Sequence, residues 1–381
     1  MIKIIGKVVV MLAILVSIPA ISSAQEILQD KFEIIRAEVV QVMNQERKTV
    51  PGTDVESNYQ TIVALILEGE RSGKEVVVEN DFLSLERGDK FFLMRTVDAI
   101  DGHEVYSVRD VDRRGAILGF VLLFVAVILI FSGRQGVRSI ASLAGSLLVI
   151  IYVLVPLLLR GFPPVLTSMV IASVILFLAI YLTHGFNRQS TIAFVGTVSA
   201  IILTGILAYL GVEIAHLSGF VSDEAVTLNF STRGALNFSG LLLGGIMIGI
   251  LGVLDDISVT QAAVVSEIFD SAPHLSRREV YKKAVRVGRE HVGALVNTLA
   301  LAYAGSSLPL LLLLSTSQTS FASTINMEVF ATEIIRTTVG SIGLILTVPI
   351  TTLLAVYFLK GHKVHAGAHC HHCHGGAGLL K

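Results

Sequence analysis

Two adjacent carboxylates in the stretch GVLDDISVTQ (252–261) are the residues best suited to chemistry. They follow the uncharged apolar segment 239–251, and no Lys or Arg occurs after Asp255 and Asp256 until Arg277. Acids in such surroundings either cap a helix, where they oppose the helix dipole, or face a polar site in the membrane. For Asp255 alone, capping is the simpler interpretation.

Asp256 has further polar residues behind it. On a helix, Thr260 and Glu267 share its face, and Gln261 lies beside them. Carboxylate, hydroxyl and amide oxygens are what a hard cation or a proton relay requires. The segment 255–270 is short and polar at one end, so we expect a separate amphipathic helix, either at the membrane interface or re-entrant.

A second polar face occurs at the start of the next apolar segment. Its members are Arg286, Glu290 and Asn297, and Arg289, His291 and Thr298 flank them. A membrane-edge acid usually pairs with a base or lines a wet cavity. We therefore expect this face and the Asp256 face to meet on the cytoplasmic side as one ion- or substrate-binding site. The alternatives are that these residues solvate a loop, and that His291 is a packed neutral imidazole and not a titrating switch.

The last residues of the chain are rich in metal ligands. They are His369, Cys370, His371, His372, Cys373 and His374. Imidazole and thiolate at this density bind Zn²⁺, Ni²⁺ or Cu. We expect metal capture by this tail, either as a physiological function or as an incidental property of any His-rich segment.

The composition indicates what must position these residues. Of 381 residues, 53% are hydrophobic and 15% charged, and the mean hydropathy is +0.74. Soluble domains are nearer one quarter charged, so the chain is expected to be an integral membrane protein. A formal net charge of −1 gives no reason to expect a nucleic-acid partner.

Four regions are expected along the chain. They are a signal peptide (1–24), an extracytoplasmic β-domain (25–113), a polytopic transmembrane domain (114–360) and a His/Cys-rich cytoplasmic tail (361–381). Lys3 and Lys7 precede an apolar core that ends in small residues, which is typical of a cleaved signal, although an uncleaved anchor has the same orientation.

The β-domain is expected to contain four to six short strands. Segments 32–43, 59–69, 74–80 and 89–95 are rich in β-branched and aromatic residues and are separated by turn residues. This spacing favours a small all-β barrel or sandwich shaped like an oligonucleotide-binding (OB) fold. The shape alone does not imply nucleic-acid binding.

The transmembrane domain is expected to be an α-helical bundle of about seven spans. Their ranges are 115–132, 139–159, 164–183, 191–212, 234–254, 291–314 and 337–359. With residue 114 outside, most Lys and Arg of the connections fall inside, as the positive-inside rule requires. Glu328, Glu333 and Arg336 are expected to form ion pairs at an external helix edge.

The order of these segments resembles the YibE/F family of polytopic membrane proteins. The resemblance covers about residues 35–358 and is strongest in GVLDDISVTQ and in GREHVGALVNTLALAYAG (288–305). It marks Gly252, Asp255, Asp256, Thr260, Gln261, Gly288, Arg289, His291, Asn297, Thr298, Tyr303 and Gly305. The resemblance implies an architecture but no substrate, and it does not include the tail after 360.

The leading functional hypothesis is a transporter or permease of the plasma membrane for an ion or small solute. The alternative is a non-transporting scaffold that recruits envelope proteins through the β-domain. We do not expect an enzyme, because the paired acids are adjacent on one helix and no Ser/His or zinc-protease motif occurs. The expected partners are the lipid bilayer, a second copy of the chain or an envelope protein.

Overall fold

The structure is a computed structural model that describes residues 31–49, 56–81, 83–98, 103–316 and 320–359. The chain forms two compact units, which divide between Phe131 and Ser132. Each unit contains a hydrophobic core of its own.

The first unit contains an antiparallel sheet of five strands, in the order β3-β2-β1-β4-β5. The strands are β1 (Lys31–Thr49), β2 (Glu56–Ile66), β3 (Glu75–Asn80), β4 (Lys90–Val97) and β5 (Glu104–Val111). The long β1 pairs with both β2 and β4. The first four strands confirm the predicted segments, and β5 falls where no particular segment was predicted.

Alternation along the strands builds the core of this sheet. In β2, Ile62, Ala64 and Ile66 are buried while the residues between them are not, as expected for one covered face. Phe91 and Leu93 of β4 complete the opposite side of the core. The result is a half-barrel that curls around one apolar face.

Charged residues link the two edges of the half-barrel. Arg71, in the β2–β3 turn, forms an ion pair with Glu104 of β5 and donates a hydrogen bond to Tyr106 Oη at 2.7 Å. Arg95 also donates to Glu104, at 2.6 Å. Hydrogen bonds from Arg71 and then Arg95 lower the pKa of Glu104 to about 2.

The sheet is joined firmly to the first helix. Asp112 accepts hydrogen bonds from the Arg114 Nε at 2.9 Å and backbone N–H at 3.2 Å, and it lies 2.8 Å from Arg36 Nε. The hydrogen bond from the Arg114 guanidinium is the main reason that the pKa of Asp112 lies well below its usual range. Helix α2 (Arg114–Val149) begins directly after this junction.

Gly133 interrupts α2. Its φ of 50° and ψ of −127° are not helical, and L-residues with a side chain rarely adopt them. A π-helical turn η1 (Ile150–Leu154) and α3 (Val155–Leu159) follow. The predicted spans 115–132 and 139–159 therefore lie within one apolar helical segment, Arg114–Leu159, that is broken at Gly133.

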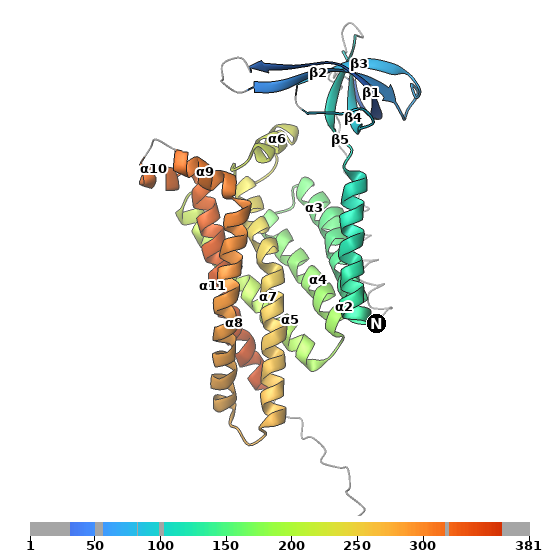
Figure 1. The fold of residues 1–381 in the computed structure, drawn as a ribbon. Helices are drawn as coiled ribbons and strands as arrows, with labels where there is room; N and C mark the ends of the chain where they lie inside the picture. The colour runs from blue at the N-terminus through green and yellow to red at the C-terminus, as the bar shows by residue number, and fades with distance from the viewer. Residues whose placement is uncertain (1–30, 50–55, 82, 99–102, 317–319, 360–381) are drawn as a thin grey trace, which may run out of the picture. The chain divides into compact units, whose positions relative to one another are not determined.

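The second unit is a helical bundle (Figure 1). Its further helices are α4 (Pro164–His184), α5 (Arg188–Ile214), α6 (Asp223–Ser231), α7 (Phe238–Ser271), α8 (Arg277–Ser306), α9 (Leu308–Thr316), α10 (Phe321–Ile325) and α11 (Glu328–Leu359). Among the described residues, five helices are long and apolar enough to span a membrane, or six if α8 and α9, bent by 67°, form one span. The predicted number of seven is thus not confirmed.

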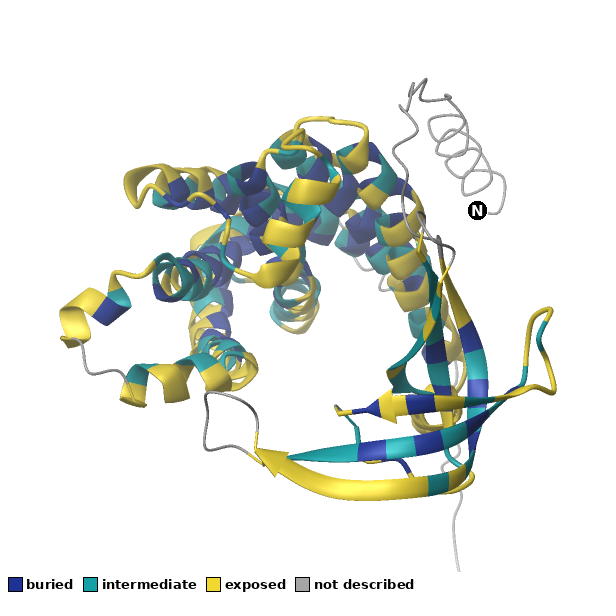
Figure 2. Ribbon diagram, turned by 90° about the horizontal axis from the view of Figure 1, so that it is seen from above, coloured by how far each residue is buried: buried dark blue, intermediate teal, exposed yellow. Residues whose placement is uncertain are grey.

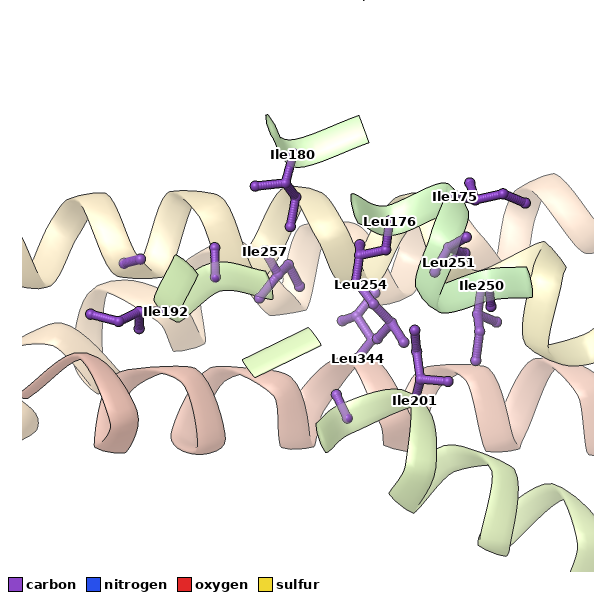
Figure 3. Packing of buried hydrophobic residues seen from close by; sticks show 14 of the residues in the cluster. Ile175, Leu176, Ile180, Ile192, Ile201, Ile250, Leu251, Leu254, Ile257 and Leu344 are labelled. Carbon is purple, nitrogen blue, oxygen red and sulfur yellow. The ribbon is translucent and has the colours of Figure 1, made fainter. Parts of the chain in front are cut away.

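Helices α7 and α11 occupy the centre of the bundle. Helix α7 packs against α4, α5, α8 and α11, and Leu254 and Leu344 meet in the core between them (Figure 3). Buried residues lie on the sides of the bundle helices that face one another, and exposed residues lie on the outer sides (Figure 2).

The prediction of a separate helix that begins at 255 is wrong. Helix α7 continues without interruption to Ser271, because Ile257, Ala262 and Val265 extend its buried apolar face and no proline interrupts the hydrogen-bond ladder. Helix α8 likewise begins well before the predicted span 291–314. Ser276 and Glu279 form a capping box at its start.

Candidate functional site

Gln261 joins three helices near one end of the bundle. It is 3% exposed, and its amide nitrogen donates hydrogen bonds to the Ala284 carbonyl of α8 and to Thr352 Oγ1 of α11, both at 2.8 Å. One turn before it, Ser258 bonds Thr351 Oγ1 at 3.2 Å. Polar side chains inside a membrane bundle require such partners.

Gly288 allows the three helices to meet this closely. A methyl group on its Cα would lie 2.6 Å from Val348 Cγ1 and 2.8 Å from Gln261 Oε1. Both distances are shorter than van der Waals contact. The resemblance marked Gly288, and the structure gives the position a packing function.

A cavity of about 380 Å³ opens beside this junction, between α7, α8 and α11. Thr260, Gln261, Glu290 and His291 lie in its wall, and Val348 and other apolar residues complete it. Figure 1 shows α7 and α8 side by side, joined by a short turn. Polar residues predicted on two separate segments are thus brought into one cavity wall, which we call the inner cavity.

The two aspartates directly precede Ile257 of α7, which lines the inner cavity. Asp255 is partly buried, and its Oδ1 has no hydrogen-bond partner among the described residues. Asp256 is exposed.

A second cavity, of about 230 Å³, lies between the α4–α5 turn, α5 and α7. His184 and Asn187, at the α4–α5 turn, line it together with Val259. Val259 and Thr260 follow Asp256 by three and four residues, which places both on its side of the helix. Asp256 therefore shares a side of α7 with one wall residue of each cavity, although Asp256 itself lines neither.

Other predicted site residues are placed elsewhere. Glu267, Arg289 and Asn297 are exposed and do not line the inner cavity. Arg286, expected on the same face as Glu290, is also exposed and outside the cavity wall. Arg286 and Asn297 thus lie outside the cavity wall, whereas Glu290, between them on α8, is part of it.

Sequence reasoning missed several polar groups of this region. His184 is the last residue of α4, and Thr352 lies inside the apolar α11. A His at the end of an apolar span and a Thr pair within one are weak signals, because both residue types occur widely in membrane helices. Only the packing of α4 and α11 against α7 identifies them.

The chemistry available here is that of oxygen and imidazole groups. Three carboxylates, a hydroxyl, an amide and two imidazoles can exchange protons or hold a hydrated cation. Among the described residues, no group of three or more His, Cys, Asp or Glu side chains is placed to hold a metal ion. The predicted metal ligands His369 to His374 lie outside the described residues.

The other end of the bundle contains a separate set of polar contacts. Glu333 and Arg336 form the predicted ion pair, at 3.4 Å within α11. The prediction of an ion pair for Glu328 is wrong. Its carboxylate accepts hydrogen bonds from the backbone N–H groups of Ser218 and Gly219, at 2.6 and 2.7 Å, and so anchors the turn after α5.

Comparison with known proteins places this architecture in one family. Residues 120–361, more than half of the chain, match the family described as YibE/F-like protein. No curated protein and no solved structure matches the chain. The matched region contains α4 to α11 with the inner cavity and both aspartates, and the chain belongs to the YibE/F-like family.

Proposed function

We propose that the protein is a membrane transporter, not an enzyme, that carries protons or small cations through the inner cavity. The observation that carries this proposal is the buried, unpartnered Asp255 Oδ1 beside Asp256 on a membrane helix. A carboxylate in lipid surroundings is costly unless it pairs or faces water, so such residues usually mark an ion pathway.

The neighbouring groups support the same function. Glu290 and His291 extend the polar surface into the inner cavity, and His184 extends it into the second cavity. A proton or cation could pass from one imidazole to the other by way of Asp256. No ATP-binding loop occurs in the sequence, so a gradient or a partner would supply the energy.

The proposal includes a seven-span topology in the plasma membrane. The segment Arg114–Leu159 has 46 residues, or roughly 69 Å of helix, about twice the hydrocarbon thickness of ~30 Å. We therefore place one span on each side of Gly133 and one in the bent pair α8–α9. The excess of Lys and Arg in alternate connections then places the β-sheet unit outside and the tail in the cytoplasm.

Ion flux into liposomes tests this function. Purified wild-type protein is reconstituted, and uptake of protons, Na⁺, K⁺ and divalent cations is measured under an imposed gradient. We expect flux of at least one of these ions, and at least a tenfold loss in Asp255→Asn and Asp256→Asn. Asp270→Asn is the matched control, because Asp270 is an exposed acid on the same helix outside both cavities.

Two results would contradict the proposal. One is that liposomes with the wild-type protein take up every tested ion no faster than protein-free liposomes. The other is equal flux in wild type, Asp255→Asn and Asp256→Asn. Either result would favour the scaffold function.

The scaffold function has one observation in its favour. Phe32 and Ile34 of β1 and Val105 of β5 are exposed on the sheet unit, by 69%, 46% and 55%. The pairing of β1 with both β2 and β4 also supports an OB-like half-barrel, a shape that binds partners on its surface. A scaffold would retain partner recruitment in Asp256→Asn and lose it in Phe32→Ser.

A further inference from the structure

The outward face of α8 is unusual for a membrane helix. Its inward face carries the buried residues Val280, Ala284, Gly288, Val292 and Leu299. The opposite side is exposed and carries Arg286, Glu290, Gly293, Asn297, Leu301 and Gly305, at helical spacing. We call these six residues the α8 outer face.

Asn297 has no hydrogen-bond partner among the residues that the structure describes. Its amide makes no hydrogen bond among the described residues, whereas the adjacent Thr298 donates to the Ala294 carbonyl at 3.0 Å. Asn297 follows Arg289, the last basic residue before the apolar run, by eight positions, or about 12 Å of helix. An amide at that depth needs a hydrogen-bond partner, because lipid tails supply none.

The glycines of the same face pack against nothing in the described part of the chain. A methyl group on Gly293 or Gly305 would meet nothing within 4 Å, in contrast to Gly288 on the inward face. Small residues on an exposed helix face allow a second helix to approach closely. These glycines therefore leave room for an additional helix.

The two charged residues of this face are free to form ion pairs with a partner. Arg286 and Glu290 are one turn apart, yet neither forms an ion pair within the described chain. The face thus presents a positive group at Arg286, a negative group at Glu290 and an amide at Asn297, followed by the apolar Leu301. An amide is both donor and acceptor, so the pattern is complementary to itself.

The one span of the first unit cannot satisfy this face. Between Gly115 and Phe131 the sequence GAILGFVLLFVAVILIF has no hydrogen-bonding side chain. A second copy of α8 can satisfy it. We propose that the α8 outer face is a homodimer interface, in which two copies pack about a two-fold axis perpendicular to the membrane.

In this dimer the two Asn297 amides pair with each other, and Arg286 of each copy faces Glu290 of the other. Copies in one membrane share the same orientation, so equivalent residues meet at equal depth. Because Glu290 also lines the inner cavity, the second copy would border that cavity. The interface itself does not depend on transport.

Disulfide cross-linking in native membranes tests the interface. Cys370 and Cys373 are the only cysteines, and replacing both by Ser gives a clean background. Asn297→Cys is expected to convert most of the protein to a covalent dimer under mild oxidation. Leu353→Cys is the control: it is exposed by 62% on α11, and we expect it to remain monomeric.

A second measurement uses the purified protein in detergent. We expect Asn297→Leu to raise the dimer dissociation constant about tenfold, measured by light scattering, while Asn297→Gln preserves the dimer. Three cross-linking results would overturn the proposal. They are equal cross-linking at positions 297 and 353, no cross-linking at position 297, and a cross-linked product whose mass is not that of a homodimer. A monomeric wild type, or an Asn297→Leu dimer as stable as wild type, would do the same.

Discussion

Replacing Gly288 by alanine should loosen the junction of α7, α8 and α11. The added methyl would lie 2.6 Å from Val348 Cγ1, whereas carbon atoms in contact lie about 3.5–4.0 Å apart. Overpacking of this size costs about 1–3 kcal/mol. Alanine gains about 1 kcal/mol over glycine in a helix, so we expect a net loss of about 1 kcal/mol.

The neighbouring hydrogen bonds make the effect larger than packing alone. The methyl would also approach Gln261 Oε1 to 2.8 Å and displace the amide that holds Ala284 and Thr352. Interhelical hydrogen bonds in membranes contribute about 0.6 kcal/mol each on average. Losing both would bring the total destabilisation to about 2 kcal/mol.

The assay is unfolding of the purified protein by titration with a denaturing detergent. Gly245→Ala is the matched control, because a methyl at Gly245 meets nothing within 4 Å, and its stability should be equal to wild type or higher. Val348→Ala removes the blocking carbon, so the double variant with Gly288→Ala should be less destabilised than the sum of the two single variants. Equal stability of Gly288→Ala and Gly245→Ala would refute the packing argument.

Three further predictions concern other parts of the chain. Glu328→Gln weakens the hydrogen bonds to Ser218 and Gly219 and should lower the free energy of unfolding by about 1–2 kcal/mol; an unchanged value would contradict the anchoring function. Gly133→Ala forces a side chain into a φ of 50° and should lower the free energy of unfolding by about 1–3 kcal/mol in the same titration. An unchanged free energy of unfolding would contradict a break of α2 at Gly133. The pKa of Glu104 is lowered to about 2 from an ordinary 4.5, so its stabilisation is complete above pH 4.5 and is lost as the pH falls toward 2. Amide exchange in β5 should rise across that window in wild type and much less in Glu104→Gln; identical profiles would contradict the assignment.

Periodicity and composition were sufficient to predict the sheet and most spans. Segment 32–43 alternates as β1 does, and the apolar run 164–183 corresponds to α4, because one-sided burial and lipid exposure each leave a pattern in the sequence. The boundary at 254 was wrong because polarity was taken for the end of a helix. Helix α7 keeps a buried apolar side past Asp256, and only its neighbours determine that.

The candidate site was predictable by residue type but not by arrangement. Thr260, Gln261, Glu290 and His291 were chosen for their chemistry, and the structure places them in one cavity wall. Asn297 was chosen on the same grounds but faces outward, because the rotation of α8 depends on how Gly288 fits against Val348. Such a rotation is set by tertiary packing and has no local signature.

Water access to the inner cavity is the most direct test of the account. In a background without Cys370 and Cys373, Thr260→Cys lines the cavity and should react with a membrane-impermeant maleimide from the cytoplasmic side. Val265→Cys, at a fully buried position of the same helix, should remain unmodified. A Thr260→Cys variant as unreactive as Val265→Cys from both sides of the membrane would contradict a polar pathway beside Asp255 and Asp256.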